Sequence, residues 1–245
     1  MYDRPEVGQA TNALWAAMRD ALREDGIDAP EALTRSGSLW DHWRSPDLVL
    51  SQTCGLPYRK ALHDHVTLIG TPDFGLPDCP PGYYNSVIVM RRDDPRSSPA
   101  DWAELRLAYN DSLSQSGWAA AEQTARAEGT RFGSHVETGA HRASVRAVAS
   151  GAADICFVDA QTWRLMSKWD PLVGSVHTVG ASAPVPGLPY ISAPGADAAA
   201  MAGAVARAID GLPAEHIRAL GITGFVHVPA ADYLAVPTPD APPAA

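Results

Sequence analysis

The residues best suited to chemistry stand in one short segment, Tyr109-Asn110-Asp111-Ser112-Leu113-Ser114-Gln115-Ser116-Gly117-Trp118. It follows the largely apolar run 105–108 and leads into an alanine-rich stretch that favours helix. This order predicts a strand, then a hydroxyl-rich loop, then the start of a helix. Serine hydroxyls and unpaired backbone N–H groups would then lie around one point. Such groups can hold an anion without a lysine or an arginine. The segment therefore predicts a small-anion site.

A plainer interpretation of the same segment is a helix cap whose hydroxyls face solvent. Serine and aspartate favour caps for purely local reasons. However, Ser112, Ser114 and Ser116 supply a hydroxyl at every second position, which is more than one cap requires. We therefore favour the anion loop.

Two titratable residues stand near further helix starts. Asp159 follows the expected strand 154–158, and we expect it to cap the next helix. As a ligand contact its carboxylate would accept from a protonated oxyanion or an amine and would repel a fully ionised phosphate. His141 would lie in the first turn of a helix, where the positive end of the dipole disfavours an imidazolium. We expect it to be neutral.

Thr53 and Cys54 stand at another expected helix start. A thiol there could be activated for catalysis, but a small pocket-lining or buried residue is the better hypothesis. Tyr84 could line an aromatic wall of a cleft or belong to the core. His63 and His65, two positions apart, would point to different faces of a helix, so we expect no metal there and no cofactor.

Elements of both kinds alternate along the chain, which predicts an α/β protein. The patterns predict helices over 6–24, 53–62, 117–127, 138–151, from 159 onward, 197–209 and 214–220, and strands over 47–50, 66–69, 84–90, 105–108, 133–136, 154–158 and 172–179. A polar break at 91–95 and a Pro/Gly-rich stretch at 181–194 divide them into two blocks. We expect lobe 1 to comprise residues 1–90 plus 182–245, and lobe 2 to comprise residues 91–181. The Pro/Ala-rich tail 237–245 is predicted to be disordered.

The amino-acid composition disfavours some classes of binding partner. The net charge of −9 disfavours nucleic acid and anionic membranes, although it does not disfavour a small anion held by local groups. No run approaches the roughly 18 to 20 apolar residues of a membrane-spanning helix, so we expect no membrane insertion. The polar start at residues 1–5 has no apolar signal core, so we expect either a leader that is missing from this sequence or a cytoplasmic protein. Three widely spaced cysteines predict free thiols.

Three segments together resemble the phosphate/phosphite/phosphonate-type solute-binding proteins of ABC importers. They are the serine loop 110–117, the helix-forming segment Thr138-Gly139-Ala140-His141-Arg142-Ala143-Ser144 and its continuation to Gly151, and Ala153-Asp154-Ile155-Cys156-Phe157-Val158-Asp159-Ala160. The resemblance covers the element order from Tyr2 to about Pro194. It implies the two-lobed type II periplasmic-binding-protein fold, with an interlobe ligand cleft and two hinge strands, and a periplasmic address.

The resemblance also implies a set of ligand contacts. In the second lobe, the oxyanion would be held by the serine loop, by a second helix start and by an acidic residue, while aromatic and hydroxyl side chains would face it from the first lobe. By position, the second-lobe contacts would be Asn110, Ser112, Ser114, Ser116, Gly117, Thr138, His141, Ser144 and Asp159, and the first-lobe contacts Tyr2, Thr53, Cys54 and Tyr84.

The sequence thus predicts a monomeric binding protein that closes on a small oxyanion or an oxyanion-bearing metabolite and delivers it to an ABC permease. Catalysis is not needed for that function. The alternative is a cytoplasmic enzyme or sensor on the same fold, with Asp159 or His141 as acid or base toward a small carboxylate or phosphonate. No pair of titratable residues stands out as a catalytic couple, so binding ranks first.

Overall fold

The chain forms two compact units in the computed structural model, which describes residues 1–243. The first unit contains residues 1–83 and 186–235, and the second contains residues 84–185 with the C-terminal segment from Val236. The chain therefore passes between the units three times. Two passages lie in the short strands β3 (Tyr83–Tyr84) and β9 (Val185–Pro186), and the third follows α9 (Ala230–Ala235).

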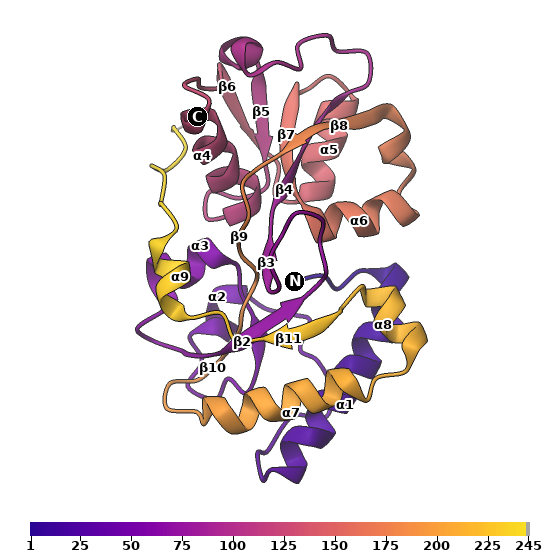
Figure 1. The fold of residues 1–245 in the computed structure, drawn as a ribbon, viewed down its shortest axis with the longest axis vertical. Helices are drawn as coiled ribbons and strands as arrows, with labels where there is room; N and C mark the ends of the chain where they lie inside the picture. The colour runs from indigo at the N-terminus through magenta and orange to yellow at the C-terminus, as the bar shows by residue number, and fades with distance from the viewer. Residues whose placement is uncertain (244–245) are drawn as a thin grey trace. The chain divides into compact units, whose positions relative to one another are not determined.

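The first unit is built on a four-stranded antiparallel sheet in the order β1-β10-β2-β11. Helix α1 packs along α7 and also contacts α8, as Figure 1 shows for the first pair. The strands are β1 (Ser51–Gln52), β2 (Thr67–Asp73), β10 (Tyr190–Ser192) and β11 (Gly224–Val226), and the other helices are α1 (Gly8–Glu24), α2 (Leu39–Trp43), α3 (Gly55–Pro57), α7 (Ala198–Asp210) and α8 (Ala214–Leu220).

The second unit is built on a five-stranded sheet in the order β6-β5-β7-β4-β8. The first three strands are parallel, while β4 is antiparallel to both β7 and β8. The strands are β4 (Ser86–Arg91), β5 (Arg106–Tyr109), β6 (Ser134–Glu137), β7 (Ile155–Asp159) and β8 (Val176–Ala181), and the helices are α4 (Ala120–Ala127), α5 (His141–Ala149) and α6 (Ala160–Trp169).

Alternating side chains of this sheet supply two separate cores. Ile155 and Phe157 of β7 pack on one face with Trp118, at the start of the helix that continues as α4. Cys156 and Val158 pack on the other face, which α5 and α6 cover with Val145, Val148 and Met166. A strand covered on both faces must be apolar throughout, and all five residues of β7 are buried.

Parallel pairing brings the carboxyl ends of β5, β6 and β7 to one edge of the sheet. Each of these strands is followed by a helix start. The register of β4 places its first residue, Ser86, opposite Asp159, the last residue of β7. The same edge therefore holds three helix N-termini and the beginning of β4.

Most predicted elements are found within a few residues of their expected bounds, but several expectations were wrong. The strand expected at 47–50 is replaced by β1 further along, and the first part of the strand expected at 172–179 is the 3-10 turn Pro171–Ser175, with a glycine at 174. The strand β10 within the Pro/Gly-rich stretch, β11 and α9 were not predicted. These elements are short, so they carry little periodic signal.

Two segments belong to a different unit from the one the expected boundaries give them. Strand β4, expected in lobe 1, hydrogen-bonds to β7 and β8 in the second unit. The segment 237–243, expected in lobe 1 and disordered, packs in the second unit, where Trp118 Nε1 donates to the carbonyl of Asp240 at 2.9 Å. Prolines lower the entropy cost of ordering such a segment. Residues 244–245 lie outside the described residues.

At the opposite edge of the second unit's sheet, a buried carboxylate connects the start of β5 to the start of β7. Asp154, 4% exposed, accepts from the backbone N–H and the guanidinium of Arg106 at 2.9–3.0 Å, and from Arg96 at 3.1 Å. Its own N–H donates to the carbonyl of Arg106 at 3.0 Å. These charged donors hold the pKa of Asp154 far below its usual range. The start of β5 is thereby attached to the residue before β7.

Replacing Asp154 by asparagine should lower the free energy of unfolding by about 2 to 3 kcal/mol at pH 7, because a neutral amide cannot satisfy two guanidinium groups. A carboxylate with a depressed pKa contributes stability above its unfolded pKa of about 4 and loses it as the pH falls. D154N should therefore lose less stability than the natural chain between pH 4 and pH 2. Urea unfolding at several pH values measures both effects. The exposed Glu128→Gln is the control, and equal stability of D154N and E128Q would contradict the assignment.

Candidate functional site

The carboxyl edge of the second unit's sheet carries a cluster of buried and half-buried polar side chains, which we call the polar edge. Its members come from the loop after β5, the turn after β6, the start of α5, the end of β7, the start of β4 and the residue after β8. They are Ser86, Ser114, Ser116, Thr138, His141, Ser144, Asp159 and Ser182.

The loop after β5 begins with a turn and ends at a capped helix. Asp111 Oδ1 accepts from the N–H of Leu113 at 2.6 Å, which shapes the turn that contains Ser112. Ser114, not Ser116, is the N-cap, since its Oγ accepts from the N–H of Gly117 at 3.0 Å. The first turn, η4 (Gln115–Ala119), is a π-helix before α4. Such wide turns are frequent at functional sites, because they reposition backbone groups.

Gly117 is required by the side chain of Asn110. A Cβ at position 117 would lie 1.8 Å from Asn110 Oδ1, far inside van der Waals contact. Asn110 Oδ1 is buried and has no hydrogen-bond partner among the described residues. The Asn110 side chain in this position therefore leaves no room for a Cβ at position 117, and these two residues of the serine loop pack directly against each other.

A hydrogen bond connects the serine loop to the start of α5. Ser116 Oγ lies 2.8 Å from His141 Nε2 and 3.4 Å from Ser114 Oγ. Burial lowers the pKa of His141 to about 4, while the backbone of Phe157 acts in the opposite direction. His141 is therefore neutral at pH 7, as expected from its place in the first turn.

Thr138 stands where the helix over 138–151 was expected to begin, but it does not cap α5. Ala140 is the N-cap residue, and the N–H and hydroxyl of Thr138 both donate to the carbonyl of Tyr109 at 2.9 and 3.0 Å. Its hydroxyl also lies 2.7 Å from Ser144 Oγ, which is fully buried. These two hydroxyls hold the turn after β6 against the end of β5.

Asp159 caps α6, as expected. Its Oδ1 accepts from the N–H of Thr162 at 2.7 Å, and the residue is 2% exposed. The N-terminus of α6 thus holds this carboxylate at the polar edge.

Two members of the polar edge were not predicted. Ser86 Oγ donates to the carbonyl of Ser116 at 2.9 Å, and its N–H donates to Ser182 Oγ at 3.0 Å. Both serines are buried. A hydroxyl at the start of the apolar run Val87–Met90 was the available signal, but only the pairing of β4 with β7 brings it to the serine loop.

The remaining predicted contacts lie elsewhere in the chain. Tyr84 is buried in the second unit and not in the first, where it was expected. In the first unit, Thr53 and Cys54 are buried at the start of α3, and Cys54 is a free thiol. The ring of Tyr2 packs edge-on against Phe74 with centroids 5.0 Å apart. These placements leave the role of each in ligand binding as a prediction.

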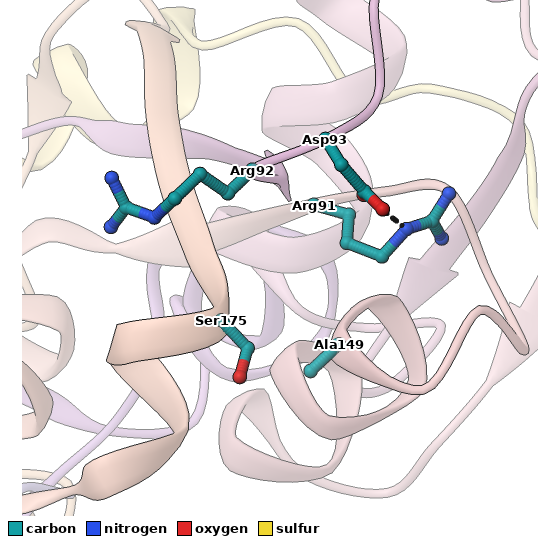
Figure 2. Close-up of a pocket in the computed structure, with 5 residues that line it drawn as sticks. All are labelled: Arg91, Arg92, Asp93, Ala149 and Ser175. Atoms are coloured by element: carbon teal, nitrogen blue, oxygen red, sulfur yellow. Dashed lines mark hydrogen bonds and ion pairs between the residues drawn. The ribbon is translucent and has the colours of Figure 1, made fainter.

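A hollow of about 330 Å³ lies at the opposite edge of the same sheet (Figure 2). Its arginines already have partners: Arg91 Nε donates to Asp93 at 2.8 Å, and Arg92 Nη2 donates to the carbonyl of Val176 at 3.0 Å. Ala149 and Ser175 complete its lining. Because Asp93 lines the hollow and compensates the charge of Arg91, and because backbone carbonyls occupy donors of Arg92, this hollow is a poorer anion site than the polar edge.

None of the described helices has the length and hydropathy that a membrane crossing requires. Among residues 1–243, His, Cys, Asp and Glu side chains form no group of three or more that could hold a metal ion.

Three solved structures share the fold over most of their length. XAC2383 of Xanthomonas citri, bound to chloride, matches with a TM-score of 0.70 and 17% identity over 94% of this chain and 90% of its own. A binding protein component of an ABC phosphonate transporter from Pseudomonas aeruginosa matches with a TM-score of 0.63 and 15% identity, covering 90% and 77% of the two chains. PhnD1 of Prochlorococcus marinus, in complex with methylphosphonate, gives 0.59 and 17%, covering 91% and 79%.

These likenesses identify the fold as that of the two-lobed periplasmic binding proteins. A search of curated proteins found no match. The family model described as "ABC transporter, phosphonate, periplasmic substrate-binding protein" matches residues 47–233, which is most of the chain. The chain belongs to the family of periplasmic substrate-binding proteins of phosphonate ABC transporters.

Proposed function

We propose that this protein binds a small phosphonate or a related tetrahedral oxyanion at the polar edge and delivers it to an ABC permease. The observation that carries the proposal is the convergence of three helix starts and several hydroxyl groups on the carboxyl ends of three parallel strands. Helix N-termini and hydroxyls stabilise anions through oriented dipoles. The methylphosphonate bound by PhnD1 supports the same ligand class for this chain.

The described hydrogen bonds suggest how an oxyanion would be received. Ser114 and Ser116 already contact each other at 3.4 Å, and each hydroxyl keeps capacity for a further bond. Neutral His141 orients the Ser116 hydroxyl without adding charge. Asp159 would accept from a hydrogen atom on the ligand, either on an acidic oxygen or on an amine, and this would favour monoanionic or amino-substituted phosphonates over a dianion.

A panel of methylphosphonate, aminoethylphosphonate, phosphite, phosphate, sulfate and acetate tests the ligand class. A true ligand at about 100 times its Kd should add about 2.7 kcal/mol of stability, which raises the Tm by several degrees. We expect the largest shift with a phosphonate or phosphite. An equal response to sulfate and acetate would contradict the proposed class, and no response to any oxyanion would contradict the proposed function.

Removing either serine hydroxyl should weaken binding of the best ligand from this panel. Ser114→Ala and Ser116→Ala should each raise the Kd roughly 10- to 100-fold, since a hydrogen bond to a charged group contributes about 1.5 to 3 kcal/mol. Ser150→Ala, an exposed serine at the other end of α5, is the matched control. Isothermal titration calorimetry measures the effect, and full affinity in both site variants would exclude this loop as the binding site.

The half-buried, desolvated His141 should make the protein less stable in mild acid. Its pKa is about 4 in the folded chain and about 6.5 when unfolded, so the unfolded state takes up the proton first as the pH falls. Stability should therefore decline between pH 6.5 and 4 by up to about 3 kcal/mol. His141→Gln should remove this part of the decline, whereas the exposed His227→Gln should not. Urea unfolding across this pH range measures it, and parallel curves for both variants would refute a neutral, desolvated His141.

The Ser116–His141 contact is also the geometry of a hydroxyl beside a base, which is the specific reason to consider catalysis. An enzyme of this fold would change its ligand. Phosphorus NMR of methylphosphonate incubated with the protein distinguishes the two functions: the binding protein returns it unchanged, whereas turnover would favour the enzyme.

A further inference from the structure

The third passage between the two units is anchored firmly in the first unit. Tyr233 of α9 is 1% exposed, its hydroxyl lies 2.6 Å from Thr71 Oγ1, and its ring packs against Tyr58 with centroids 5.2 Å apart. The neighbouring Asp232 accepts from the hydroxyl of Tyr83 at 2.9 Å. These contacts fix the chain immediately before it leaves this unit.

The same segment is anchored again in the second unit a few residues later. Gln123 Nε2 of α4 donates to the carbonyl of Pro237 at 2.5 Å. Trp118 Nε1 donates to the carbonyl of Asp240 at 2.9 Å, and the indole is 3% exposed. Figure 1 shows this last, yellow part of the chain running beside α4. Both anchors lie on the helix that begins with the serine loop.

The anchor at Pro237 is only four positions after the anchor at Tyr233. A fully extended chain of that length spans at most about 14 Å, because each residue adds no more than about 3.6 Å. Prolines at 237 and 239 stiffen the segment. The units therefore cannot separate at this point beyond that limit unless the anchors break.

We propose that residues 234–240 form a strap that limits the opening of the two units and holds the serine-loop helix in place. The proposal rests on the proposed function, in which closure of the units around the ligand produces binding. The other two passages are the paired strands β3 and β9, where changes in the backbone torsions would allow the units to open and close. A third tether excludes the widest open states. The ligand-free protein then keeps a larger fraction of binding-competent molecules, and this lowers the apparent Kd.

The test compares a chain that ends at Ala235 with a control chain that ends at Pro243. Small-angle X-ray scattering without ligand should give a larger radius of gyration for the shorter chain than for the control. The Kd for methylphosphonate should rise roughly tenfold, as expected if the competent fraction falls tenfold. The control should match the full chain in both measurements.

A second variant guards against loss of folding in the truncated chain. Trp118→Phe with Gln123→Ala keeps the whole chain and an aromatic ring against Tyr109, but removes both donors to the segment. It should also have a larger radius of gyration without ligand. The same radius in the variants and the control would overturn the strap. Scattering needs no ligand, so it decides this question even if methylphosphonate fails to bind, an outcome that would count against the proposed function instead.

Discussion

The parallel pairing of β5 with β6 and β7 is the constraint on which the polar edge depends. Ser116 and His141 are 25 positions apart in the chain, yet their side chains meet at 2.8 Å, because the strands that precede them end at the same edge. Strands β5 and β7 are buried on both faces and carry alternating side chains into two cores, while β6 forms the edge of the sheet. A slip of one residue in any strand would exchange those faces and also move its helix start away from the others.

The local chemistry of this edge could be predicted from the sequence. A helix cap is decided within three or four residues, so Asp159 was assigned correctly, and the serine loop was found at the end of its strand. The exact cap could not be predicted this way. The first turn is a π-helix that begins at Gln115, two residues before the expected start at 117, so the N-cap is Ser114 and not Ser116. The helix start expected at Thr138 was wrong, because the hydrogen-bond partner of Thr138 is the carbonyl of Tyr109 on a different strand.

Features that depend on pairing between distant parts of the chain could not be predicted from the sequence. The apolar run that forms β4 is compatible with either unit, and only its hydrogen bonds with β7 and β8 assign it. Ser86 enters the polar edge as a result of that register. The C-terminal segment has a composition typical of disorder, and two side chains more than one hundred positions away supply its partners. Amino-acid composition indicates whether a segment can fold by itself, but not whether another part of the protein offers a surface on which the segment can pack.

The contact between Asn110 and Gly117 restricts how this site can change over evolutionary time. A larger residue at 117 can be accommodated only if the side chain of Asn110 moves, so a substitution at either position affects the other. The serine loop is therefore slow to diversify. A relative that comes to bind a bulkier ligand is expected to enlarge its pocket elsewhere. The contacts to the acidic group of the ligand would stay the same, while the contacts to the rest of the ligand would change.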